Sequence, residues 1–89
     1  MHALVVRVSL SDAESARKTL TEKVVPAVSQ SNGFIAGYWT WSADQSNGQS
    51  MIVFESEDDA RTMADRIRGL VAEGATLEST EVREVVASA

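Results

Sequence analysis

Several residue types are scarce or missing in this chain of 89 residues, beginning with cysteine, which is absent. Without cysteine there are no disulfide bridges, thiolate metal sites or cysteine nucleophiles. His2 is the only histidine, so nitrogen ligands are too few for a transition-metal site and no metal is expected. Positive charge is also in deficit, because 8 Lys and Arg stand against 13 Asp and Glu. The net charge of -5 argues against nucleic acid or an anionic membrane as a partner.

Long apolar runs and linkers are missing as well. No stretch approaches the roughly 20 apolar residues that cross a bilayer, so no membrane-spanning helix is predicted. The first residues pass directly into a strand-like pattern, with no basic leader or cleavage site, and we therefore expect a cytoplasmic protein. No segment rich in proline or glycine divides the chain. Residues 1–89 are predicted to form one domain.

What is present is a regular alternation of strand and helix signals. Four short segments are rich in β-branched or aromatic residues, which predicts strands at 3–10, 34–41, 50–55 and 76–86. Apolar residues at spacings of three and four predict one helix after the first strand and a second helix over 60–71. The expected order is therefore strand, helix, strand, strand, helix, strand.

Local signals mark where the two predicted helices begin and where the first one is interrupted. Ser11 followed by Glu14 fits a capping box for the first helix, and Ser56 begins a similar motif for the second. Pro26 lies inside the first helical pattern and has no backbone donor. We therefore expect a kink or break near Val25.

This element order, repeated in two similar halves, predicts a ferredoxin-like βαββαβ fold of the α+β class. Two interlocking β-α-β units give a four-stranded antiparallel sheet with two helices on one face. The bare face should then be polar, yet strand 34–41 places Phe34 and Tyr38 on one face and Trp39 and Trp41 on the other. Two further strands are likewise apolar on both faces. We therefore expect a homodimer that buries sheet against sheet.

Three short motifs extend over nearly the whole chain. They are the Val-rich first strand with Arg7, the sequence Ser31-Asn32-Gly33-Phe34 followed by Gly37-Tyr38-Trp39, and the passage from a strand to an acidic-capped helix over 51–60. On these motifs the chain resembles the antibiotic-biosynthesis-monooxygenase-like family of the dimeric α+β barrel superfamily. The resemblance implies a dimeric α/β barrel in which an apolar pocket lies between the sheet and the helices.

The resemblance also has implications for chemistry. The family includes oxygenases that need no metal or flavin, so the resemblance implies no cofactor. In these enzymes an electron-rich aromatic substrate, held as its anion, reacts with oxygen directly. A neighbouring haem-degrading family is disfavoured, because its motif needs an asparagine on the first strand, where this chain has Arg7. That motif also needs a histidine on the second helix, which this chain lacks.

Six residues are candidates for lining a ligand pocket: Arg7, Tyr38, Trp39, Trp41, Phe54 and His2. Arg7 offers a charged fork for a phenolate, but the favoured interpretation places it on the dimer-facing side, paired with a glutamate of the last strand such as Glu81. The Tyr38, Trp39 and Trp41 rings suit a ring-shaped ligand, and suit a dimer interface slightly better. His2 is a candidate base close to the terminus, and strand spacing alone makes Phe54 a core residue.

These observations leave three functional hypotheses open. The first is a small-molecule-binding protein that resembles cofactor-independent monooxygenases acting on aromatic or phenolic substrates. The alternative is a non-catalytic dimeric binding or accessory module, in which the aromatic residues only hold the dimer together. The third is an isomerase acting on a small lactone. An open cavity reached by Arg7, Tyr38 or Trp39 would favour chemistry, whereas a filled space between sheet and helices would favour the accessory module.

Overall fold

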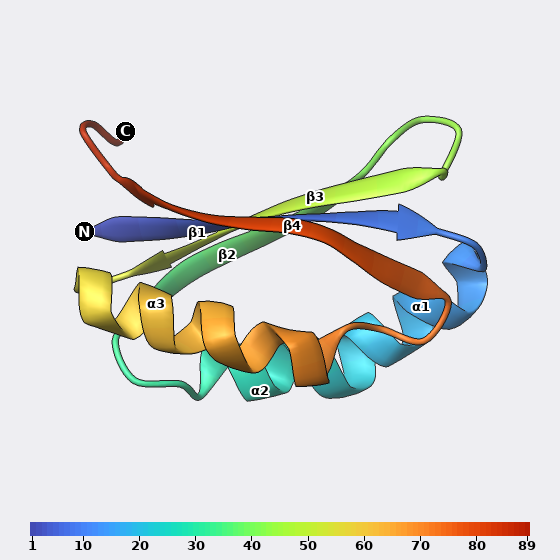
Figure 1. Cartoon of the computed structure of the whole chain (residues 1–89), viewed down its shortest axis with the longest axis horizontal. Coiled ribbons are helices and arrows are strands. Elements are labelled where there is room, and N and C mark those ends of the chain that lie inside the picture. The colour runs from blue at the N-terminus through green and yellow to red at the C-terminus, as the bar shows by residue number, and fades with distance from the viewer.

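Four antiparallel strands form one sheet in the computed structural model, which describes all 89 residues. The strands are β1 (His2–Leu10), β2 (Phe34–Trp41), β3 (Asn47–Phe54) and β4 (Ala75–Glu84), in the spatial order β2-β3-β1-β4. Figure 1 shows every helical segment below this sheet, on one of its faces. The predicted ferredoxin-like α+β fold is confirmed.

The helical layer is built from two continuous runs of helical segments, one before β2 and one after β3. They are α1 (Ala13–Thr19), the π-helical η1 (Leu20–Val24), α2 (Val25–Ser29), α3 (Glu57–Arg66) and the 3₁₀ segment η2 (Ile67–Leu70). None of these helices combines the length and the apolarity that crossing a bilayer demands.

The two halves of the chain are joined by equivalent contacts. Gly33 follows the first helical region and Gly74 follows the second, and both have positive φ. The Gly33 carbonyl accepts from the Glu55 N–H at 2.8 Å, just before α3. The Gly74 carbonyl accepts from the N–H groups of Ser11 and Asp12, at 2.8 and 3.1 Å, just before α1. Each half therefore fixes the start of the helix of the other half.

The two helix caps differ in how well the sequence indicates them. Ser56 caps α3 as predicted, since its hydroxyl oxygen accepts from the Asp59 N–H at 3.1 Å. The predicted cap of α1 by Ser11 is wrong. Asp12 takes that position and accepts from the Ser15 N–H at 3.1 Å, while the Ser11 hydroxyl donates to the Gly74 carbonyl. The hydroxyl of Ser11 is thus used to close the loop before β4.

The expected interruption at Pro26 takes the form of a π-helical turn. In η1 the backbone widens, so that the Val25 N–H donates to the Leu20 carbonyl, five residues earlier. Pro26 then stands in the first turn of α2, where its missing donor is tolerated. The helix continues past Pro26, and Val24 before the proline and Val28 after it are both buried.

The predicted distribution of side chains between the two sheet faces is wrong at Phe34, because β2 begins with a bulge. The register shifts between Phe34 and Ala36, so that Phe34 lies opposite Phe54 on the helix-facing side. The Phe34 and Phe54 rings pack edge to face, with centroids 6.4 Å apart. Simple alternation places Phe34 with Tyr38 because it does not count the extra residue. Tyr38 remains on the bare face and is 71% exposed.

One apolar core lies between the sheet and the helices. Its buried members are Leu4, Val6, Val24, Val28, Ile52, Phe54, Ala60, Met63 and Ile67. The opposite sheet face has no covering layer in the chain (Figure 1). On that face Tyr38 and Met51 lie side by side in register, and Met51 is 46% exposed.

Candidate functional site

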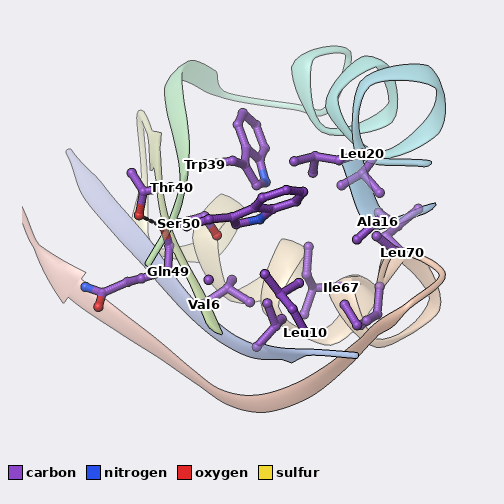
Figure 2. Close-up of a pocket in the computed structure, with 17 residues that line it drawn as sticks. Val6, Leu10, Ala16, Leu20, Trp39, Thr40, Gln49, Ser50, Ile67 and Leu70 are labelled. Atoms are coloured by element: carbon purple, nitrogen blue, oxygen red, sulfur yellow. Dashed lines mark hydrogen bonds between the residues drawn. The ribbon is translucent and has the colours of Figure 1, made fainter. Parts of the chain in front are cut away.

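An apolar pocket lies between the helix-facing side of the sheet and the helical layer (Figure 2). It is hydrophobic at 13 of its 17 lining positions. The lining residues are Val6, Val8, Leu10, Ala16, Leu20, Val24, Trp39, Thr40, Trp41, Gly48, Gln49, Ser50, Ile67, Leu70, Val71, Ala72 and Ala75. Its free volume is about 60 Å³, which is room for a few water molecules.

Two indole rings from β2 form one wall of this pocket, and glycines determine how closely they approach the sheet. A Cβ on Gly37 would lie 2.9 Å from the six-membered ring of Trp39. A Cβ on Gly48, which faces Trp41 across the β2–β3 pair, would lie 2.9 Å from Cδ1 of Trp41. Both rings therefore rest on bare backbone, which places them deeper than any larger residue would allow.

A cation covers the outer side of one indole. The guanidinium carbon of Arg17, on α1, lies 4.7 Å from the centroid of the Trp41 ring. This distance is typical of a cation–π contact, which holds the ring and the helix together. Arg17 is not part of the pocket lining, so its charge lies outside the apolar space.

Ser50 is a lining residue that the sequence did not indicate. It lies on β3 opposite Trp39 on one side and Val6 on the other, and only 8% of it is exposed. It is the one buried polar residue of the chain. Its hydroxyl makes no hydrogen bond to any other group of the chain and borders the pocket. A serine in a strand is unremarkable as a sequence signal, and only the register reveals which way it points.

The lining contains no ionisable side chain. The perturbed carboxylates lie elsewhere, at helix starts and in the hairpin loop. Hydrogen bonds from the backbone and hydroxyl of Ser15 lower the pKa of Asp12. Hydrogen bonds from Ser46 and Ser42 lower the pKa of Asp44, and a hydrogen bond from Arg61 lowers the pKa of Glu57. These shifts reflect helix capping, a loop and a surface ion pair. The pocket itself can bind, but it holds no acid or base.

The structure separates five of the six candidate residues into three groups. Trp39 and Trp41 line the pocket together, so they lie on the helix-facing side and not on the bare sheet face. Phe54 is fully buried in the core and does not line the pocket. Tyr38 and Arg7 are on the opposite face of the sheet, so they do not reach this space.

Arg7 lies on the bare face, the side expected to face a second copy, but it forms no ion pair with Glu81 within the chain. It lies between Gln49 and Ser79 on the bare face, and it makes no salt bridge within the chain. Glu81 instead pairs with Arg83, which is on the same strand and face, at 3.0 Å. The pair does not form within the chain because the register places Glu81 beside Val5 rather than beside Arg7.

His2 lies at the other end of β1, away from the pocket. Its register partners are Phe54 and Glu84, and its Nδ1 atom is buried without a hydrogen-bond partner. Its charge contributes to the lowered pKa of Glu57, after the larger effect of Arg61. No group of three or more histidine or carboxylate side chains comes together in a way that would hold a metal ion.

The sheet order and the single helical layer define a ferredoxin-like α+β protein, and solved structures share this fold over nearly the whole chain. A proposed antibiotic biosynthesis monooxygenase from Deinococcus radiodurans matches with a TM-score of 0.68 and 14% identity, covering 100% of this chain and 96% of that one. A monooxygenase of Streptomyces coelicolor, solved in complex with nanaomycin D, matches with a TM-score of 0.61 and 15% identity, covering 99% and 92%.

A third structure bears on assembly. A dimeric ferredoxin-like protein from an uncultured marine organism matches with a TM-score of 0.60 and 10% identity, covering 99% of this chain and 97% of that one. No protein-family model matches the sequence, and no curated protein matches it significantly. The resemblance to antibiotic-biosynthesis-monooxygenase-like proteins is therefore confirmed at the level of the fold.

Proposed function

We propose that the chain is a small-molecule-binding protein that takes a flat aromatic or phenolic ligand into the pocket beside Trp39 and Trp41. The observation that carries this proposal is the pair of indoles seated on glycines in an otherwise apolar lining. Flat rings stack on such surfaces, and burial of apolar area supplies most of the binding free energy. The fold is shared with a monooxygenase that was solved with nanaomycin D, which supports a ligand of the same broad kind.

The ligand must widen the pocket in order to enter. The free volume of about 60 Å³ is well below the ~150 Å³ cavity that accepts benzene. The segment that can yield is α1 with η1, where Ala16 and Val24 are the only buried residues. Segments with few buried contacts open at the lowest free-energy cost. Binding should therefore move this segment rather than the sheet.

Calorimetric titration with 1-naphthol tests the proposal. We expect saturable binding to the native chain and at least a fivefold loss of affinity in both Trp39→Leu and Trp41→Leu. Tyr38→Phe is the matched control, because it changes the neighbouring aromatic residue on the opposite face. Equal affinities for all four proteins would contradict the proposed pocket.

Oxygenation of the bound ligand is a second candidate function, favoured by the fold shared with a monooxygenase. Because the lining has no base, the bound ligand would have to lose its proton to hydroxide from the solvent. Turnover should then rise with pH, which an oxygen electrode can follow. Binding of 1-naphthol without oxygen uptake at any pH would leave a binding or accessory module. A lactone isomerase has no support in a lining without acid or base.

We further propose that the protein acts as a homodimer joined through the bare sheet face. Tyr38 and Met51 present exposed apolar area there, and Arg7 has no ionic partner within the chain. A second copy would cover the two apolar side chains, and its carboxylates would neutralise Arg7. One of the proteins with this fold is dimeric, which supports the same assembly.

A further inference from the structure

The Ser50 hydroxyl is an unsatisfied polar group in an apolar surrounding. Ser50 lies on the helix-facing side of β3, where its strand neighbours on that side are Gly48 and Ile52. More than nine-tenths of the residue is buried, and its hydroxyl has no hydrogen-bond partner in the chain. The hydroxyl oxygen itself is not sealed off, since the buried side-chain polar atom without a partner is Nδ1 of His2. A ligand that enters the pocket therefore meets a hydroxyl that is free to form a hydrogen bond with it.

The other polar side chains around the pocket either form a hydrogen bond within the chain or point away from the pocket. The Thr40 hydroxyl, on the opposite face, donates to the Gln49 carbonyl at 2.5 Å. Figure 2 shows the side chain of Gln49 directed away from the cluster of apolar side chains, and the oxygen of Ser50 at its edge beside the indoles. The floor of the pocket therefore offers one free side-chain hydroxyl.

The absence of charge in the lining limits what this hydroxyl can hold. A carboxylate or phosphate would lose its hydration on entering the pocket and would find no cation there, because Arg17 lies outside the lining. A neutral hydroxyl or ketone needs only one hydrogen bond, which a serine can donate or accept. Apolar rings would meet the remaining walls.

We infer that Ser50 selects the ligand, and that the pocket takes the neutral form of a flat aromatic molecule carrying one phenolic hydroxyl or ketone oxygen, seated against the Ser50 hydroxyl. This inference rests on the proposed aromatic ligand and adds the polar group that orients it. Ser50 is a specificity-determining residue, since no bond is made or broken by it. Its hydroxyl distinguishes an oxygenated ring from a hydrocarbon of the same shape.

Paired ligands of equal shape test the inference by calorimetry at neutral pH. 1-Naphthol and 1-methylnaphthalene differ only in a hydroxyl against a methyl group. We expect the native chain to bind 1-naphthol roughly fivefold more tightly, the effect of one neutral hydrogen bond. In Ser50→Ala that preference should be lost or reversed, because the ligand hydroxyl would have no partner in the lining, while the affinity for 1-methylnaphthalene is kept or increased. Ser79→Ala, on the opposite face, should retain the native preference.

A second measurement distinguishes ligand recognition from a structural role. Without ligand, Ser50→Ala should unfold at an equal or higher urea concentration than the native chain, because alanine removes the unpaired hydroxyl. A clear loss of stability would overturn the inference, since the hydroxyl would then have a partner within the fold.

The outcomes separate this inference from the proposed function. If both naphthalenes bind the native chain and Ser50→Ala with an unchanged ratio, the role of Ser50 is overturned while the aromatic pocket stands. Tighter binding as the pH rises through the pKa of 1-naphthol would overturn the preference for the neutral form. If neither compound binds the native chain, the proposed function falls and this inference falls with it.

Discussion

At the scale of single residues, the shape of the pocket depends on atoms that are missing from two glycines. Gly37 and Gly48 both have negative φ, so their backbone geometry would accept another residue. What excludes a larger residue is the indole that lies on each. Glycine at these positions therefore serves packing rather than a turn.

Gly48→Ala tests this role. The new Cβ would lie 2.9 Å from Trp41 Cδ1 and 3.1 Å from Val8 Cγ2, so one of them must move. We predict a loss of about 1–3 kcal/mol in the free energy of unfolding, measured by urea titration, and a shift in tryptophan emission. Gly69→Ala is the control, because nothing lies within 4 Å of its Cβ, and it should be neutral or slightly stabilising.

The hydrogen-bonded Asp12 predicts how the stability of the fold changes with pH. Its pKa in the folded chain lies below the ordinary value of 3.8, because Ser15 donates to the carboxylate. Below pH 3.8 the unfolded chain therefore binds more protons than the folded chain, and the free energy of unfolding falls as the pH falls through the lowered pKa. Above pH 3.8 this contribution is fully present.

Asp12→Asn keeps the cap acceptor and removes the titration. We predict a shallower fall in urea midpoint between pH 4 and pH 2 for this variant than for the native chain, with Asp44 and Glu57 still contributing falls of the same sign. Asp65→Asn removes an equal charge from an exposed position of α3. A native-like pH profile for Asp12→Asn would refute the assignment.

Individual site residues could be predicted from the sequence only where the residue type is rare and suited to binding a ligand. Trp39 and Trp41 stand out in sequence, and the alternation of a strand places them on one face. Ser50 and Gly48 carry no comparable signal, because serine and glycine are common in strands that begin at a hairpin. Arg7 attracts attention as a charge in an apolar strand, yet it lies on the other face from the pocket.

At the scale of elements, a serine before each helix predicts an N-cap in both cases, but only one of the two serines caps its helix. Ser56 caps α3, whereas Ser11 lies one residue too early and Asp12 caps α1. The difference arises from the contact of Ser11 with Gly74, on the far half of the chain. Local motifs cannot report such a contact.

Ser56→Ala should therefore destabilise the fold by about 1 kcal/mol, the usual cost of losing an N-cap hydroxyl. The Ser56 hydroxyl also donates to the Asp59 carboxylate at 2.8 Å. The substitution therefore removes a hydrogen-bond partner from both the N–H and the carboxylate of Asp59. Urea titration measures the change. Ser88→Ala, in the exposed C-terminal tail, should have no effect, and an equal loss in both variants would refute the cap.

Element boundaries were predicted closely, and irregular elements were not. The expected strand at 34–41 coincides with β2, and the other strands begin or end within a few residues of their predicted limits. The bulge at Ile35 and the π-helical turn at Leu20–Val24 each change the periodicity by one residue. Periodicity arguments assume a constant repeat, so they cannot anticipate either irregularity.

At the scale of the whole molecule, the chain exposes more surface than its mass requires. Its accessible area is 5579 Å², whereas a compact monomer of 9.6 kDa exposes about 5100 Å². Two apolar side chains, Tyr38 and Met51, belong to the uncovered sheet face. The topology itself was predictable from element order, because few arrangements of six such elements avoid crossed connections.

The proposed dimer predicts concentration-dependent stability. The native chain should sediment as a dimer at micromolar concentration, and its Tm should rise with protein concentration. The double variant Tyr38→Lys and Met51→Lys places two charges on the bare face and should be monomeric. Thr62→Lys, exposed on α3, is the control for added charge and should remain dimeric. A native chain that sediments as a monomer would refute the interface.

The pairing of β1 with β4 also places the two chain ends together. The Val85 N–H donates to the Met1 carbonyl at 3.0 Å, and both ends emerge on one side of the molecule (Figure 1). The order in which the elements are connected can therefore be changed without changing how they pack. A circular permutant with Ala89 joined to Met1 by a short glycine–serine linker, and new ends opened at Ser42–Ser46, should give the same circular dichroism and 1-naphthol affinity. The pocket would then form from the same elements in a different order along the chain.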